Sequence, residues 1–256
     1  MHPADIDLLA MLKRVKLPTV ADLLPRFIER AAAESWSHRD FLAAILAEEV
    51  AHRENTRIVR SARLARFPYL KTIEEFDFTF QSSIKRSLLG PFLDPDFVVN
   101  GRNLVLAGKP GLGKTHLAIA IAYKAIQHGC DARFISATDL IDDLAAAAKD
   151  GRLRDATAGY LDPDVLIIDE VGYLQHADSA ANVLYGVIDG RCHRKRPMIF
   201  TTNKPLREWG EVLHDKLLAE AILDRILEHG THIMLDGRSY RTRDRDSDDP
   251  AMLPDG

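Results

Sequence analysis

The feature of this sequence that most constrains its fold is the octapeptide at residues 108–115, which reads Gly-Lys-Pro-Gly-Leu-Gly-Lys-Thr. It matches G-x-x-x-x-G-K-[ST], the pattern of a phosphate-binding P-loop. An apolar run at residues 103–107 precedes it and another at 117–122 follows it, so the motif lies between a predicted buried strand and a predicted helix. That context distinguishes a P-loop from a chance glycine-rich turn. The sequence therefore predicts an α/β fold with a site for phosphate groups.

The loop supplies the groups that such a site needs. Glycines allow consecutive backbone N–H groups to point at phosphate oxygens, and the N-terminus of the next helix adds partial positive charge. Lys114 is predicted to reach the β- and γ-phosphates of ATP, and the Thr115 hydroxyl to ligate Mg²⁺. The predicted nucleotide contacts are Gly108, Lys109, Pro110, Gly111, Leu112, Gly113, Lys114, Thr115 and His116.

A second group of polar residues follows two later apolar runs. Residues 165–168 are apolar and end in Asp169 and Glu170. A buried strand would deliver Asp169 to the carboxyl edge of the sheet, where it can serve as a Mg²⁺ ligand. Glu170 is the candidate for activating the attacking water. Residues 200–203 end the next predicted strand, and Asn203 there is predicted to lie near the γ-phosphate and orient water.

From residue 103 onward, short apolar runs alternate with helical patterns. This alternation is typical of a parallel sheet covered on both faces. The predicted strands are 103–107, 132–136, 165–169, 198–202 and 232–236.

The first part of the chain has helical periodicity instead. Residues 5–15 predict a short amphipathic helix that ends before Pro18. Thr19 with Asp22 reads as a capping box for a second helix, and Ser37 with Asp40 opens a third that could continue to about Arg66. We therefore divide the chain into a helical domain at 1–66, a connector at 67–101, a nucleotide-binding domain at 102–243 and a tail at 244–256.

Charge and composition exclude little. The net charge is −4, and the tail alone holds five acids and one base, which also gives −4, so residues 1–243 sum to zero. The tail is expected to be disordered. No membrane-length apolar run or signal-peptide pattern is present, and Cys130 and Cys192 are too few for a disulfide framework, so a cytoplasmic protein is expected.

Two features of the sequence leave alternatives open. Arg53, Arg57, Arg60 and Arg63 recur along the third predicted helix, and they form either a solvated face or a stripe that contacts DNA phosphates. Phe76, Phe78 and Phe80 in the connector are read as core packing, with stacking on a nucleotide base as the alternative.

Taken together, the motifs resemble those of the AAA+ ATPases. More closely, the chain resembles the IstB-type ATPase helpers of insertion-sequence transposons, which are related to DnaC-type helicase loaders and the initiator DnaA. The stretches that carry the resemblance are residues 65–71, 76–78, 113–118, 169–174, 202–203, 221–227 and 239–241.

The resemblance implies roles for further residues. Asn203 would be the sensor-1 residue, and Arg225 an arginine finger that reaches the nucleotide of a neighbouring subunit. An ion pair of Arg225 with Asp224 or Glu228 is the alternative. Arg241 or Arg243 would contact the nucleotide as a sensor-2-like group, and a full helical lid is not expected. A helical element at 138–161 would grip DNA through Lys149, Arg152 and Arg154, with the solvent-facing end of a packed helix as the alternative for these residues.

The function implied by the resemblance is that of an ATPase helper of transposition. Such a protein would oligomerise with ATP on double-stranded target DNA and recruit or stimulate a cognate transposase. A replicative helicase loader is the alternative, and a neighbouring transposase or helicase gene would discriminate the two. A binding module with a vestigial ATP site is a third reading, which intact Lys114, Asp169 and Glu170 disfavour.

Overall fold

The computed structural model describes residues 7–172 and 180–243. It divides into two compact units, with the boundary between Arg60 and Ser61. The acidic tail, the first residues of the chain, and Tyr173 and Leu174 of the resemblance lie outside the described residues.

The first unit consists of helices. They are α1 (Leu8–Arg14), α2 (Pro18–Ala33) and α3 (His38–Leu64). The last residues of α3, from Ser61 onward, belong to the second unit. Val20, Phe27 and Ile45 form the buried centre of this unit. Ser37 accepts the backbone N–H of Asp40 at 3.1 Å, so it caps α3 as the sequence predicts.

The capping box predicted at Thr19 is wrong, because α2 already begins at Pro18 and makes no side-chain cap of its own. A carboxylate from α3 instead accepts a backbone N–H at the start of α2. Glu49, which is buried, accepts the backbone N–H of Val20 at 3.2 Å and is paired with Arg53 at 2.7 Å. The free N–H groups of a helix start need an acceptor, but the acceptor can come from a distant part of the chain.

A five-stranded sheet forms the centre of the second unit, and all the strand pairs are parallel. The spatial order is β2-β3-β4-β1-β5. This confirms the predicted fold class. The strands are β1 (Asn103–Ala107), β2 (Ala132–Ser136), β3 (Val165–Asp169), β4 (Met198–Thr202) and β5 (Gly230–Met234). Only β5 begins earlier than predicted, because Gly230 already pairs with Asn103.

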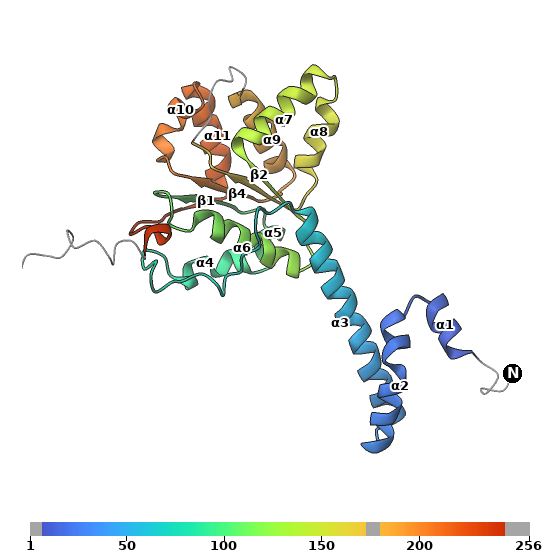
Figure 1. Ribbon diagram of the computed structural model, residues 1–256. Coiled ribbons are helices and arrows are strands. Elements are labelled where there is room, and N and C mark those ends of the chain that lie inside the picture. The colour runs from blue at the N-terminus through green and yellow to red at the C-terminus, as the bar shows by residue number, and fades with distance from the viewer. Residues whose placement is uncertain (1–6, 173–179, 244–256) are drawn as a thin grey trace, which may run out of the picture. The chain divides into compact units, whose positions relative to one another are not determined.

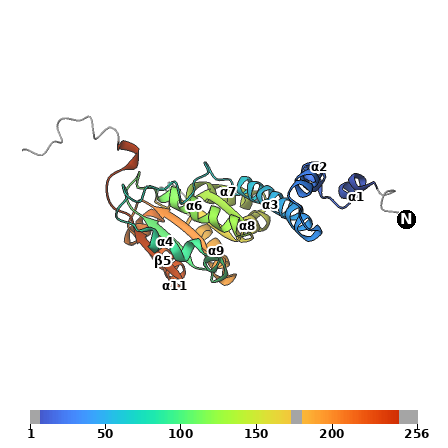
Figure 2. The same cartoon turned by 90° about the horizontal axis from the view of Figure 1, so that it is seen from below.

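Helices cover both faces of this sheet (Figure 1). On one face lie α4 and α6; on the other lie α7, α8, α9, α10 and α11, and Figure 2 views the same elements from below. Their bounds are α4 (Arg86–Leu93), α5 (Asp96–Val99), α6 (Lys114–Gln127), α7 (Ala137–Lys149), α8 (Leu153–Leu161), α9 (Ala180–His193), α10 (Trp209–Val212) and α11 (Lys216–Glu228). The unit also contains the short 3-10 helices η2 (Leu206–Glu208) and η3 (Tyr240–Thr242).

One buried arginine ties the starts of two strands to a helix end. Arg191 of α9 is fully buried and donates to the carbonyl oxygens of Tyr160, Pro163, Asp164 and Pro197 at 2.8–3.0 Å. Burial lowers its pKa to about 9. These carbonyls belong to the end of α8 and to the residues before β3 and β4, so the arginine fixes the amino edge of the sheet.

The parallel strands end at a common edge, and that edge carries the predicted site. The P-loop follows β1, Glu170 follows β3 and Asn203 follows β4. Among the described residues, β5 is followed only by η3 and no helical lid. No helix in the described parts of the chain has the length and apolar character needed to cross a membrane.

Candidate nucleotide-binding site

The loop between β1 and α6 has the backbone conformation that its glycines permit. Gly113 precedes α6 with a φ of +86°, a left-handed conformation. A Cβ added there would lie 2.6 Å from Cε2 of Phe76, and one added at Gly108 would lie 2.3 Å from the carbonyl oxygen of Leu235. Both positions therefore require glycine for conformation and for space.

Lys114, the first residue of α6, folds back over this loop. Its Nζ donates to the carbonyl oxygens of Gly108 at 2.7 Å and Lys109 at 2.8 Å. Burial lowers its pKa, while the charge of Asp169 acts in the opposite direction. A partly buried ammonium group held only by carbonyls can bind a phosphate with little loss of solvation.

Asp169 lies beside the end of the P-loop. Thr115 Oγ1 donates to Oδ1 of Asp169 at 3.0 Å, and Thr201 Oγ1 donates to the same oxygen at 2.5 Å. Burial raises the pKa of Asp169, although these two hydrogen bonds and Lys114 oppose the shift. A carboxylate and a hydroxyl in contact are the oxygen donors that Mg²⁺ prefers, so Thr115 and Asp169 fit the ion.

Glu170 adopts a left-handed backbone conformation, with a φ of +58°. Its N–H donates to Thr201 Oγ1 at 2.9 Å, so one buried hydroxyl contacts both adjacent acids. Left-handed backbone at a residue other than glycine is uncommon and is often found at functional sites. Thr201 lies in the same strand end as Asn203, but nothing in the sequence around it signals this role.

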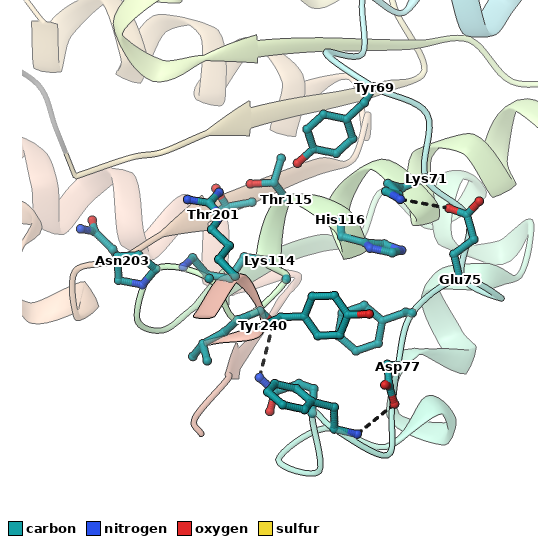
Figure 3. A pocket seen from close by; sticks show the side chains of 18 of the residues that line it. Tyr69, Lys71, Glu75, Asp77, Lys114, Thr115, His116, Thr201, Asn203 and Tyr240 are labelled. Carbon is teal, nitrogen blue, oxygen red and sulfur yellow. Dashed lines mark hydrogen bonds and ion pairs between the residues drawn. The ribbon is translucent and has the colours of Figure 1, made fainter. Parts of the chain in front are cut away.

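The predicted residues lie around one pocket of about 550 Å³ (Figure 3). Lys114, Thr115, Thr201 and Asn203 gather at one part of it, and Tyr240 lies at another. Glu170, His116 and Arg241 also line the pocket. Arg241 lowers the pKa of Lys114, which places both positive charges near the same space.

The connector forms much of the opposite wall. Phe76 is buried, packs edge-on against Phe78 and His116, and also faces the pocket. Phe80 packs edge-on against Tyr240, with ring centroids 5.3 Å apart, and both line the pocket. Core packing and access to a ligand are therefore compatible for these rings. His116 Nε2 lies 2.8 Å from the carbonyl oxygen of Thr72, so the connector is fastened directly beside Thr115.

Arg225 is not part of this pocket. Its side chain pairs with Asp189 of α9 at 3.2 Å and more weakly with Glu228 at 3.8 Å. It lines a second pocket of about 330 Å³ together with Asn103 and His229, which lie at the starts of β1 and β5. The structure therefore places Arg225 at the amino edge of the sheet, opposite the P-loop.

The residues predicted to contact DNA occupy two regions. Lys149, Arg152 and Arg154 are exposed around the turn from α7 to α8, and Arg152 pairs with Asp150 at 2.8 Å. In α3, Arg60 and Arg63 are exposed, Arg57 is half-buried, and Arg53 contacts Glu49 and the carbonyl oxygen of Lys16. Arg53 thus has contacts within the helical unit that its sequence position did not indicate.

Comparison with known proteins gives these features a context. A family model described as "IstB-like ATP binding protein" matches residues 10–248. This chain belongs to the IstB-like family. An ATP-binding protein of insertion sequence IS5376 from Geobacillus stearothermophilus is 38% identical over 232 residues, which cover 91% of this chain and 92% of the relative.

Solved structures similar to this IstB-like chain establish the fold further. AMPPCP-bound DnaA from Aquifex aeolicus has a TM-score of 0.55 at 18% identity and covers 71% of this chain and 55% of DnaA. The DnaC helicase loader has a TM-score of 0.51 at 23% identity and covers 68% of this chain and 98% of the loader. The IstB-like chain therefore has the AAA+ fold and belongs to an ATP-binding family of insertion sequences, which confirms the resemblance seen in the sequence.

Proposed function

We propose that this chain is an ATP-hydrolysing helper protein of transposition, which assembles on double-stranded target DNA with ATP and recruits or stimulates the cognate transposase. The observation that carries the proposal is the contact of Thr115 with Asp169 at 3.0 Å, beside Lys114 and Glu170 in one pocket. Membership of an insertion-sequence family supports the biological setting.

In the hydrolytic step, Lys114 leaves the carbonyls of the P-loop and neutralises charge on the β- and γ-phosphates. Thr115 and Asp169 would hold Mg²⁺, which supplies further neutralisation of the phosphates when bound. Glu170 accepts the proton of the attacking water, and Asn203 orients that water. The backbone conformation of Glu170, held by Thr201, keeps the carboxylate at the pocket.

The position of Arg225 supports the proposed assembly. Asn103, which shares its pocket, is the first residue of β1, and the P-loop follows the last. The strand length separates these ends by about 13 Å. Arg225 is therefore poorly placed for the nucleotide of its own subunit, and a role as an arginine finger requires the nucleotide of a neighbour. Its side chain is 39% exposed and so can take part in such an interface.

DNA contact is assigned to the exposed basic residues at the turn from α7 to α8 and in α3. Flexible lysine and arginine side chains bind the phosphate backbone with little sequence preference. Such binding suits a helper protein that has to act on many target sites. Affinity for duplex DNA should therefore fall steeply as the salt concentration rises.

The test measures the particle mass of the wild type and of Lys114→Ala on duplex DNA, with and without ATP. The wild type should assemble only with ATP, and Lys114→Ala should stay unassembled. Lys85→Ala is the matched control, because Lys85 is exposed at the start of α4 and outside the pocket. Tight assembly of Lys114→Ala without nucleotide would contradict the proposal.

A second variant tests the subunit boundary. Arg225→Ala should lower both the particle mass in ATP and the rate of ATP turnover, the latter by about 10³–10⁵-fold, as in other arginine-finger NTPases. If mass and turnover both stay at the wild-type values, the cross-subunit role of Arg225 is wrong.

A further inference from the structure

Tyr69 is a pocket residue to which neither the sequence analysis nor the proposed hydrolytic step gives a role. It lies in the connector directly after α3 and lines the nucleotide pocket. The residue is 46% exposed and lines the pocket, so a ligand in the pocket can reach it. Figure 3 shows its hydroxyl group pointing towards Thr115, away from the part of the pocket that holds Tyr240.

The short segment that carries Tyr69 is fastened at both ends. Before it, the carbonyl oxygen of the fully buried Ala65 accepts the N–H of Phe134 in β2 at 2.8 Å. After it, the carbonyl oxygen of Thr72 contacts His116 of α6 at 2.8 Å. Pro68 further restricts the backbone between these anchors. The tyrosine is therefore held at the wall of the pocket by contacts to two different elements of the sheet domain.

The groups around the hydroxyl decide what it can bind. Burial raises the pKa of Tyr69, and the charges of Asp169 and Glu170 raise it further, while Arg241 lowers it. The phenol therefore stays protonated at neutral pH and can donate a hydrogen bond. The charges of Asp169 and Glu170 both act on this hydroxyl, which agrees with its direction towards Thr115 in Figure 3.

A nucleotide bound to the P-loop would present a specific acceptor to this donor. Lys114 and Thr115 hold the β- and γ-phosphates in P-loop proteins, and the attacking water lies beyond the γ-phosphate. A hydroxyl that points towards Thr115 from the opposite wall therefore faces the terminal phosphate and not the base or ribose. ADP lacks this phosphate and offers the donor no equivalent partner.

We propose that Tyr69 is a specificity-determining residue, whose hydroxyl donates to the terminal phosphate of the bound nucleotide, directly or through one water, and so distinguishes triphosphate from diphosphate. The assignment rests on the proposed function, because it assumes that ATP occupies this pocket. It adds a connector residue, outside the P-loop and the strand ends, that recognises the state of the nucleotide.

The test compares the affinities of the full-length wild type and Tyr69→Phe for ADP and for the non-hydrolysable triphosphate AMPPNP, both with Mg²⁺. Loss of a hydrogen bond to a charged group should weaken AMPPNP binding about tenfold. ADP affinity should stay within about twofold of the wild type, because the phenyl ring keeps its packing. Tyr123→Phe is the matched control, since Tyr123 lies on α6 and does not line the pocket.

The outcomes separate this inference from the proposed function. Wild-type protein that binds neither nucleotide contradicts the proposed function and the role of Tyr69 with it. Wild-type protein that binds both, with Tyr69→Phe unchanged or weakened equally for AMPPNP and ADP, overturns the role of Tyr69 alone. Thermal unfolding of Tyr69→Phe at the wild-type temperature would show that any loss is not a loss of folding.

Discussion

Thr201 and Asp169 share a short hydrogen bond, with Thr201 Oγ1 lying 2.5 Å from Asp169 Oδ1 at the carboxyl edge of the sheet. Thr201 Oγ1 also accepts the backbone N–H of Glu170 at 2.9 Å. One buried hydroxyl therefore supports the carboxylate assigned to Mg²⁺ and fixes the backbone of the carboxylate assigned to water activation. The geometry of these two acids depends on a residue that carries no charge.

The first prediction concerns that hydroxyl. Thr201→Val keeps the shape of the side chain but removes both hydrogen bonds. We expect the ATP turnover number to fall about tenfold to a hundredfold, because a buried carboxylate loses a partner and Glu170 loses its tether. Affinity for ADP should change less, since Lys114 and the P-loop backbone remain. Steady-state kinetics and ADP binding measure the two effects separately.

Thr201→Ser is the matched control for this prediction, because serine retains the hydroxyl. It should recover most of the wild-type turnover. Equal turnover of the valine and serine variants would show that the hydroxyl has no part in placing Glu170.

The contrast between Asp169 and Thr201 shows what the sequence could and could not reveal about the site. Asp169 could be predicted because a run of four apolar residues ends in an acid, and parallel strands end at one edge. Thr201 precedes Asn203 at another strand end, but its partners are distant in sequence. Asp169 lies 32 residues before it and Glu170 lies 31 residues before it. Only the pairing of β3 with β4 brings the hydroxyl to the acids.

The second prediction concerns the turn after β3. A Cβ at Gly172, whose φ is +156°, would lie 2.6 Å from Oδ1 of Asn203 and 3.1 Å from Cγ of Lys204. Gly172→Ala should therefore displace Asn203 and lower ATP turnover about tenfold, while nucleotide affinity changes little. Turnover and binding assays measure this. The control is Gly186→Ala in α9, where an added Cβ meets no atom within 4 Å, and a loss of turnover there as large as at Gly172 would contradict the steric argument.

The third prediction concerns the metal ion. Removal of Mg²⁺ with a chelator should weaken ATP binding by the wild type about tenfold or more, because the charge on the phosphates is then opposed only by the protein. Asp169→Asn should bind ATP weakly with or without Mg²⁺, since it lacks the carboxylate that fits the ion. Calorimetry at fixed ionic strength measures both affinities.

Asp155→Asn is the matched control for the metal, because Asp155 is exposed on α8 and does not line the nucleotide pocket. Its response to the chelator should equal that of the wild type. Undiminished dependence on Mg²⁺ in Asp169→Asn would show that another group holds the ion.

The fold was more accessible to sequence reasoning than the contacts between distant segments. Four strands begin and end where the apolar runs predict, because burial on both faces gives each strand a continuous apolar sequence. β5 is an edge strand with mostly exposed residues, so its apolar pattern is weak and its predicted start was late by two residues. Glu49 at the start of α2 and Arg191 at the sheet edge could not be predicted, because their partners are defined only by tertiary structure.

The fourth prediction concerns His116, which fastens the connector to α6 through Thr72. Burial lowers its pKa from the ordinary 6.5, although the hydrogen bond to Thr72 opposes the shift. A histidine with a lowered folded pKa contributes its full stability above the unfolded pKa, and this contribution is lost as the pH falls below 6.5 towards the folded value. The wild-type melting temperature should therefore fall between pH 7.5 and pH 5.5 by about 2 °C more than that of His116→Gln, which can donate to Thr72 but gains no proton. His232, whose pKa burial also lowers, is present in both proteins, so its effect cancels in the comparison. If the melting temperatures of the two proteins fall by the same amount across this pH range, the His116 contact does not respond to protonation.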